Sequence, residues 1–183
     1  MGNRLTKIYT RTGDDGSTGM ADGSRVEKDA LLVHAIGEVD ELNSVLGVLV
    51  CHVPDEFIMP VRTIQNELFN VGAELAMNVA MLKQSHVDCL EQSLDDLNQS
   101  LPVLKEFILP GGGLAASHCH VARAVCRRVE RSLVSLNKQQ TLNTCLMAYI
   151  NRLSDYLFVL ARAITQATGE NEIYWQSERL KNI

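Results

Sequence analysis

Apolar side chains return every three or four residues over most of the chain, the spacing that places them on one face of an α-helix. The clearest run is Val39, Leu42, Leu46 and Leu49. Four further runs of the same kind follow it. The pattern therefore predicts five helices, over residues 34–51, 58–80, 85–101, 114–137 and 142–168.

Proline, serine and glycine mark the expected ends of these helices. Pro54 and Pro60 should interrupt the connection before the second helix, because proline cannot donate a backbone hydrogen bond. Ser85 should cap the third helix and Pro102 should end it. Gly169 should stop the last one, since glycine readily adopts the left-handed conformation found there.

Two segments lack the helical pattern. Residues 1–33 interleave glycines with aspartate, serine and threonine, which favours turns and exposed backbone amides. Residues 107–113 form a short apolar, strand-like run that ends in three glycines. We therefore predict an all-α fold in one domain of residues 1–183. Its parts are a long N-terminal loop region (1–33), a five-helix up-and-down bundle (34–168) and a tail (169–183).

Composition narrows the class of protein. Hydrophobic residues make up 46% of the chain and aromatic residues only 5%, a balance that favours packed helices over a β-sandwich. The net charge of -5 argues against a general nucleic-acid binder but leaves room for a local basic pocket. No apolar stretch approaches the ~20 residues that span a membrane.

Cysteine and histidine spacing excludes two kinds of site. Five cysteines without a CxxC pair indicate reduced thiols in a cytoplasmic protein rather than disulfides or a zinc site. A di-iron bundle needs Glu-x-x-His on two helices, and this sequence does not occur in the chain.

The N-terminal loop carries the first candidate site. Its polar and glycine residues are Thr10, Arg11, Thr12, Gly13, Asp14, Gly16 and Ser17. Flexible glycines let successive N–H groups converge on an anion, and Lys28 downstream adds positive charge. Glycine content alone does not distinguish a phosphate-binding loop from a surface turn.

Polar residues on three predicted helices form the other candidates. Arg123, Arg127 and Glu130 lie on one face of one predicted helix, and two arginines four residues apart suit a phosphate or a carboxylate. Asn151 offers the paired donor and acceptor that a nucleotide needs. Asp40 interrupts an apolar helix and, if buried, needs a cation such as Arg123. A solvated helix face remains the alternative for each group.

The order of these motifs carries more information than any one of them. The successive motifs are Lys7–Gly16, Asp22–Val26, Val39–Ser44, Phe107–Gly112, His120–Arg131, Tyr149–Asp155 and Glu172–Trp175. In this order they closely resemble the propanediol-utilisation-type ATP:cob(I)alamin adenosyltransferases. The resemblance spans nearly the whole chain.

The resemblance implies homotrimers with active sites between neighbouring subunits. It implies that the N-terminal loop wraps the triphosphate of ATP with help from Lys28, and that Arg127 and Asn151 contact ATP from the opposite side. Glu130 would brace the arginines. Asp40 and Arg123 would form a salt bridge across the subunit boundary.

The implied reaction transfers the 5′-deoxyadenosyl group of ATP to cob(I)alamin, giving adenosylcobalamin and triphosphate. Cobalt(I) is itself a strong nucleophile, so the protein needs alignment and positive charge rather than a catalytic serine, cysteine or general base. Mg²⁺ is expected at the triphosphate. Phe107 resembles the family residue that displaces the lower axial ligand of cobalt.

Two alternative functions remain open. An adenosylcobalamin carrier without turnover would not need the complete set of ATP residues. A helical nucleotide-binding regulator would not explain the run 107–112. The expected protein partners are a cob(II)alamin reductase and an adenosylcobalamin-dependent enzyme, and neither nucleic acid nor membrane is expected as a partner.

Overall fold

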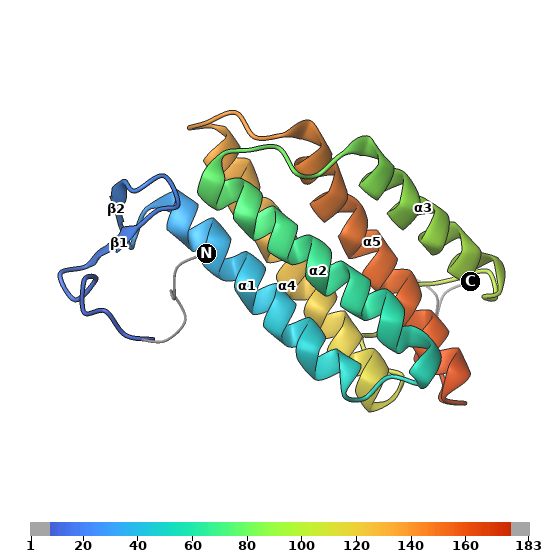
Figure 1. The fold of residues 1–183 in the computed structure, drawn as a ribbon. Helices are drawn as coiled ribbons and strands as arrows, with labels where there is room; N and C mark the ends of the chain where they lie inside the picture. Colours follow the sequence, from blue (N-terminus) through green and yellow to red (C-terminus); the bar gives the residue numbers. More distant parts are fainter. Residues whose placement is uncertain (1–7, 177–183) are drawn as a thin grey trace.

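The computed structural model describes residues 8–176 and contains the predicted helical bundle (Figure 1). Its helices are α1 (Leu31–Val50), α2 (Asp55–Met77), α3 (Gln84–Gln99), α4 (Gly113–Asn137) and α5 (Thr144–Ala167). Lys7 of the first motif and the end of the predicted tail, 177–183, lie outside the described residues. None of the helices in the described part is long and apolar enough to cross a membrane.

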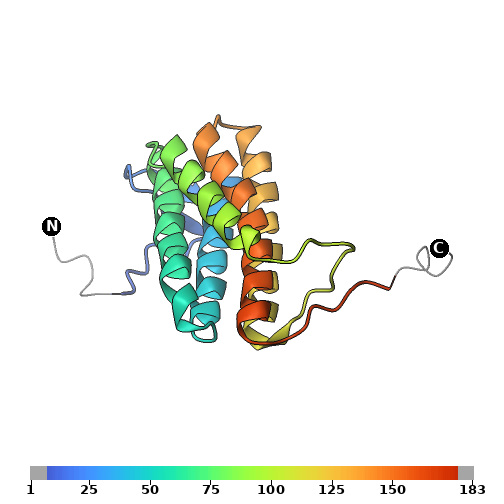
Figure 2. The ribbon, with the colours of Figure 1, turned by 90° about the vertical axis from the view of Figure 1, so that its right-hand side faces the viewer.

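The four long helices lie side by side, and α3 packs on the outside of α5 (Figures 1 and 2). The closest helix pairs are α4 with α5, α1 with α4, α1 with α2, and α3 with α5. Most of the residues that the periodicity placed inward form the core, among them the fully buried Leu42, Leu46, Leu133 and Leu153. Val79 is an exception, because it is exposed and lies beyond the end of α2. The prediction of a five-helix bundle is therefore confirmed.

The helices α1 and α4 run in opposite directions. His52, just after α1, stacks on His118 near the start of α4, with ring centroids 5.2 Å apart. The loop before α1 and the loop before α4 therefore leave the bundle at opposite ends. Figure 1 shows the N-terminal segment at one end and the chain after α5 at the other.

The N-terminal segment is more ordered than the predicted loop. Two three-residue strands, β1 (Ser17–Gly19) and β2 (Arg25–Glu27), pair antiparallel and form a hairpin ahead of α1. The first helix begins at Leu31 rather than at residue 34. The prediction missed the strands because three residues are too few to show an alternating pattern.

Two residues that were assigned to helix ends lie inside helices instead. Ser85 lies inside α3, whose N-cap is Lys83, because the ring nitrogen Nδ1 of His86 accepts the Lys83 N–H at 2.9 Å. Pro60 lies inside α2 rather than in the link before it. The predicted stop at Gly169 is confirmed, since Gly169 follows the end of α5 with a φ of 71°.

The strand-like run before α4 pairs with the chain after α5. Ile108 forms an isolated antiparallel bridge with Tyr174, and Figure 2 shows the two segments running out from the same end of the bundle. Gly112 brings this loop against α5: a Cβ there would lie 2.9 Å from Thr165 Cγ2 and closer still to its Oγ1. Only glycine allows this approach.

Candidate functional site

The N-terminal loop is closed on itself by Lys28. The Lys28 ammonium donates to the Gly13 carbonyl at 2.6 Å, and the Lys28 N–H donates to the Gly16 carbonyl at 2.9 Å. A Cβ on Gly13 would come within 2.9 Å of the Ser17 carbonyl oxygen. Thr10 and Thr12 share a hydrogen bond of 2.9 Å between their hydroxyls. The structure thus brings together the loop residues that the sequence singled out.

Arg25 of β2 is a second cation of this loop, and the sequence analysis did not assign it to the site. Its guanidinium donates to the Thr12 carbonyl and to the Ser17 hydroxyl, and lies 3.5 Å from the Asp15 carboxylate. The Ser17 N–H and hydroxyl, and then Arg25, lower the pKa of Asp15. The carboxylate of Asp14 makes no hydrogen bond or ion pair within residues 8–176 and is exposed.

Side chains on facing turns of α4 and α5 form a polar row, which we call the α4–α5 strip. Its members are His120, Arg123, Arg127 and Glu130 of α4, with Asn151 and Phe158 of α5. The Asn151 amide donates to Glu130 at 2.6 Å. The Arg127 guanidinium is exposed and makes no ion pair among the described residues. An exposed guanidinium beside a fixed amide suits a phosphorylated ligand.

A pocket of about 540 Å³ continues the strip at its apolar end. Phe107, Ile108, Pro110 and Phe158 supply its apolar wall, and Arg123 is among its polar lining residues. The Phe107 ring is 74% exposed, so it is not part of the core. Its edge contact with Trp175 holds it at the mouth of the pocket.

His120 lines the same pocket and is neutral at physiological pH. It is 5% exposed and packs on Phe158, with ring centroids 6.2 Å apart. Burial and then the charge of Arg123 lower the pKa of His120 from 6.5 to about 4, and Glu172 offsets only part of this. Within residues 8–176, neither His120 Nδ1 nor Arg123 Nε has a hydrogen-bond partner. Two buried polar atoms beside an open pocket indicate a site built for a polar ligand or a partner chain.

Asp40 and Arg123 do not pair within the chain. Asp40 is exposed on α1 and forms no ion pair in the described part of the protein. The nearby residues Glu38 and Glu41 form ion pairs with Arg128 instead, and Arg128 Nε lies 3.9 Å from Glu38 Oε1. The arginine that faces α1 within one chain is therefore Arg128.

The loop and the Phe107 pocket lie far apart in one chain. The hairpin precedes α1, whose start lies beside the end of α4, whereas Phe107 precedes the start of α4. Helix α4 has 25 residues. At a rise of 1.5 Å per residue it separates the two ends by about 37 Å.

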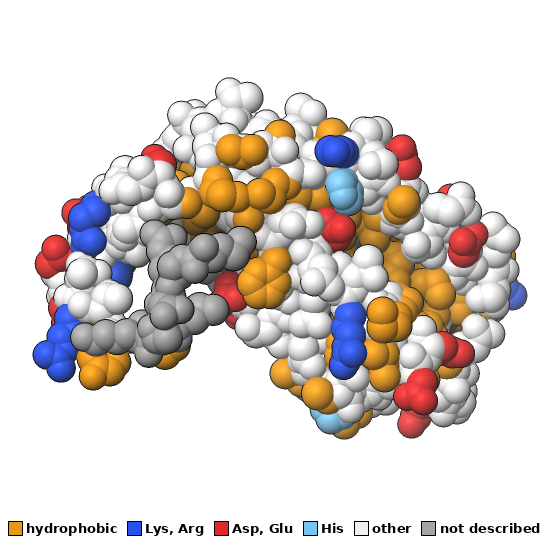
Figure 3. All heavy atoms as spheres, in the orientation of Figure 1, with side chains coloured by type: hydrophobic (Ala, Val, Ile, Leu, Met, Phe, Trp, Pro, Cys, Tyr) orange, Lys and Arg blue, Asp and Glu red, His pale blue; other side chains and the backbone are white. Residues whose placement is uncertain are grey.

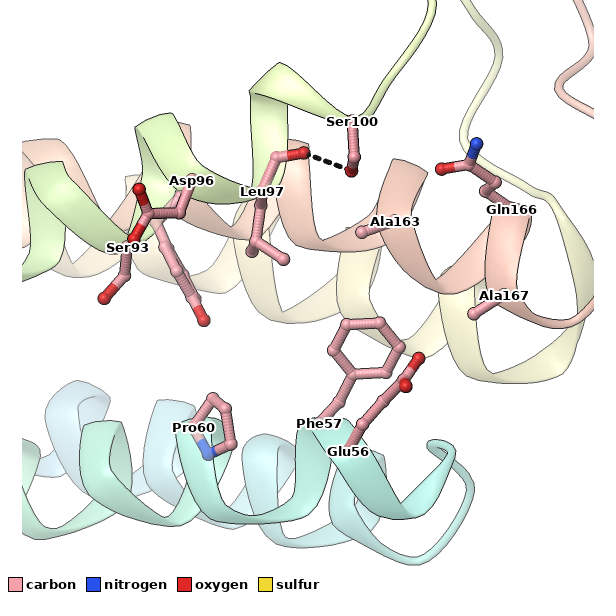
Figure 4. Close-up of a pocket in the computed structure, with 11 residues that line it drawn as sticks. Glu56, Phe57, Pro60, Ser93, Asp96, Leu97, Ser100, Ala163, Gln166 and Ala167 are labelled. Atoms are coloured by element: carbon pink, nitrogen blue, oxygen red, sulfur yellow. Dashed lines mark hydrogen bonds between the residues drawn. The ribbon is translucent and has the colours of Figure 1, made fainter.

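A separate hollow contains none of the predicted site residues. It lies between α2 and α3 over α5 and measures about 550 Å³, with Phe57, Leu97 and Tyr156 among its lining residues (Figure 4). Figure 3 shows hydrophobic side chains gathered on this side of the molecule. The predicted site residues therefore lie elsewhere, in the N-terminal loop, on α1 at Asp40, in the α4–α5 strip and at Phe107.

The family model of the cobalamin adenosyltransferases matches residues 8–164 of the chain. The chain belongs to the cobalamin adenosyltransferase family. The match includes the N-terminal loop, the Phe107 run and the whole α4–α5 strip.

Relatives in this family are similar over almost their full length. A cobalamin adenosyltransferase of Cupriavidus metallidurans is 49% identical over 182 residues, which cover 98% of this chain and 99% of the relative. A corrinoid adenosyltransferase of Bacillus subtilis is 38% identical, over 93% of this chain and 92% of its own.

Solved structures of adenosyltransferases share the fold. A variant of the PduO-type ATP:corrinoid adenosyltransferase of Lactobacillus reuteri, complexed with cobalamin and ATP, has a TM-score of 0.88 at 35% identity. The match covers 93% of this chain and all of that one. A second variant of the same adenosyltransferase, complexed with ATP, also has a TM-score of 0.88.

Proposed function

We propose that this protein is an ATP:corrinoid adenosyltransferase that transfers the 5′-deoxyadenosyl group of ATP to cob(I)alamin and releases triphosphate. The observation that carries the proposal is the α4–α5 strip. It joins an apolar pocket of about 540 Å³ to an exposed arginine and a fixed amide that suit a nucleotide. The related structure with both cobalamin and ATP bound supports the same pairing of ligands.

Residues of the loop and of the α4–α5 strip have proposed roles in binding ATP. The loop residues Thr10–Ser17 and Lys28 would bind the triphosphate through backbone amides and the Lys28 charge, once Lys28 exchanges the Gly13 carbonyl for phosphate oxygens. Arg127 would bind the leaving triphosphate, and Asn151 would orient the nucleoside. Glu130 holds the Asn151 amide at 2.6 Å and so fixes which atom it presents.

Phe107 would exclude the lower axial ligand of cobalt. Cobalt(II) is hard to reduce while that ligand donates to it, so a bulky apolar ring in its place assists reduction. The ring is exposed at a pocket mouth and braced by Trp175, as this role requires. Cobalt(I) then attacks the 5′ carbon of ATP without a protein nucleophile or general base.

The active site would be shared between subunits of a homotrimer. The N-terminal loop and the Phe107 pocket lie at opposite ends of one chain, so two chains are needed to place the loop over an ATP that reaches cobalt. Arg123 Nε is buried without a partner among the described residues, while Asp40 is exposed and unpaired there. A salt bridge from Arg123 to Asp40 of a neighbouring subunit would satisfy both.

The donor set fits Mg²⁺ only together with phosphates. No group of three His, Cys, Asp or Glu side chains that could hold a metal occurs within residues 8–176. Mg²⁺ commonly binds through one or two carboxylates and substrate phosphates. Asp14, the unpaired carboxylate of the loop, would supply the protein ligand, and the ion would neutralise charge on the triphosphate.

The test is anaerobic turnover of the purified protein with ATP, Mg²⁺ and chemically reduced cobalamin. We expect the cob(I)alamin absorbance to decay and a light-sensitive adenosyl product to form together with triphosphate. Arg127→Ala should slow product formation by about 100-fold, whereas the control Arg131→Ala, one turn further along α4, should retain it. Binding of both ligands without product would refute the proposal and favour a carrier.

We also propose a cytoplasmic setting. It is supported by five cysteines that form no disulfide within residues 8–176. The partners would be a cob(II)alamin reductase and an enzyme that uses adenosylcobalamin. Neither nucleic acid nor a membrane would be a partner.

A further inference from the structure

Arg162 is a buried charge in the last third of α5. It is 4% exposed and stands in an otherwise apolar stretch between Leu160 and Ile164. A charge withdrawn from water in this way is costly unless it is paired and hydrogen-bonded. Its partners therefore indicate what the charge is for.

The Arg162 guanidinium ties together two segments that leave the bundle at the same end. Its Nε lies 2.6 Å from Oε1 of Glu172, in the chain after α5. Its Nη2 donates to the Pro102 carbonyl at 2.8 Å, in the chain after α3. The Glu172 side chain is itself only 15% exposed, so solvent screens this pair little.

The same two segments then pair with each other at Phe107. The Trp175 N–H donates to the Phe107 carbonyl and the Leu109 N–H donates to the Ile173 carbonyl, both at 2.7 Å. The Trp175 ring meets the Phe107 ring edge-on, with centroids 6.3 Å apart. Two backbone bonds and one ring contact make a ladder too short to be stable without an anchor.

We propose that Arg162 is a positioning residue for Phe107, acting through Glu172 on the segment that pairs with residues 107–109. The guanidinium and the carboxylate fix both segments to the rigid helix α5, and the short ladder transmits that fixation to the Phe107 ring. The inference rests on the proposed role of Phe107 as the group that displaces the lower axial ligand of cobalt. It adds a residue that contacts neither cobalamin nor ATP.

The position of Glu172 favours this role over a purely structural one. Glu172 directly precedes Ile173, whose carbonyl accepts the Leu109 N–H at 2.7 Å. Its charge also offsets part of the lowering of the pKa of His120, which lines the Phe107 pocket. Movement of Glu172 would therefore shift the segment that pairs with residues 107–109.

The test uses Glu172→Gln in the full-length protein, with Glu170→Gln as the matched control. Glu170 is exposed, lies two residues earlier in the same segment and forms no ion pair among the described residues. The readout is the four-coordinate cob(II)alamin signal in EPR and absorption spectra at saturating ATP, with KM for ATP and for cobalamin. Phe107→Ala is measured alongside, and thermal unfolding shows that each variant is folded.

We expect Glu172→Gln to lose most of the four-coordinate signal and to slow turnover by about 10- to 100-fold, as for a reacting group held about 1 Å out of place. KM for ATP should stay within about twofold of the parent, because the residues assigned to ATP lie elsewhere. Trp175→Ala, at a half-exposed side chain, should weaken the same signal without affecting folding.

These measurements distinguish a failure of the positioning role from a failure of the proposed role of Phe107. If Phe107→Ala loses the signal while folded Glu172→Gln and Trp175→Ala keep it, the positioning role is wrong and the proposed function stands. If Phe107→Ala itself keeps the signal, the proposed role of Phe107 is wrong, and the positioning role is wrong with it.

Discussion

Replacing Gly112 by alanine should destabilise the protein through two separate effects. Gly112 has a φ of 91°, in the left-handed region that residues with a Cβ adopt at a cost of about 1–2 kcal/mol. The new Cβ would also lie 2.9 Å from Thr165 Cγ2 and closer still to its hydroxyl, both on the buried face of α5.

The magnitude follows from adding these effects. Overpacking a close contact costs about 1–3 kcal/mol. The two effects together predict a loss of about 2–5 kcal/mol for Gly112→Ala. Gly169→Ala is the matched control, because its φ is 71° and nothing lies within 4 Å of the added Cβ. It should lose only about 1–2 kcal/mol.

The assay is urea unfolding of both variants, each alone and combined with Thr165→Ser, which removes the Cγ2 methyl. A lower midpoint at an unchanged slope reports a change in stability alone. Thr165→Ser should recover part of the loss in Gly112→Ala and none in Gly169→Ala. Equal losses for the two glycine variants would show that the contact with Thr165 can relax, and the steric argument would be refuted.

Three further predictions concern the site. Arg127→Ala should raise KM for ATP or lower kcat by about 100-fold, since the leaving triphosphate loses a charged partner, and wild-type kinetics would contradict this. Lys28→Met should raise KM for ATP while KM for cobalamin stays constant. A change in KM for cobalamin alone would contradict the assignment of the loop to ATP. The pKa of His120 is about 4 in the folded state and 6.5 in the unfolded state, so the unfolded state takes up the proton first as pH falls. The free energy of unfolding should therefore decrease by up to about 3 kcal/mol between pH 6.5 and pH 4. His120→Leu should flatten this dependence in unfolding curves; an unchanged slope would assign it to other groups.

The helices could be predicted because each long helix buries a continuous apolar face. Leu146, Ile150, Leu153 and Leu157 of α5 are fully buried, and their spacing alone revealed the helix. The ends were less accurate because they depend on local hydrogen bonds. The start of α3 is fixed by the His86 ring, and histidine is not among the usual capping residues.

Much of the site could also be predicted, since its members repeat on one helix face or cluster in one loop. The sequence could not show which acidic residue pairs with which arginine. Glu38, Asp40 and Glu41 all lie on α1, and which of them meets an arginine of α4 depends on how the two helices are rotated against each other. The contacts of Arg128 with Glu38 and Glu41 therefore emerged only from the packed structure.

The pairing of the C-terminal tail could not be predicted either. Nothing in the local sequence states that residues 173–175 pair with 107–109, because strand pairing joins segments that are distant along the chain. One signal was available: Arg162 stands alone in a buried apolar stretch, and a buried charge requires a partner somewhere. A search for that partner would have led to the acidic residues of the tail.

The distance between the N-terminal loop and Phe107 has a genetic consequence. If a neighbour supplies the loop to each pocket, a chain with a damaged loop and a chain with a damaged pocket are defective in different halves of the site. Co-expressed, Lys28→Met and Phe107→Ala chains should assemble mixed oligomers in which some interfaces combine two intact halves. Activity at limiting ATP should then exceed that of either variant expressed alone, whereas two loop alleles should never complement each other.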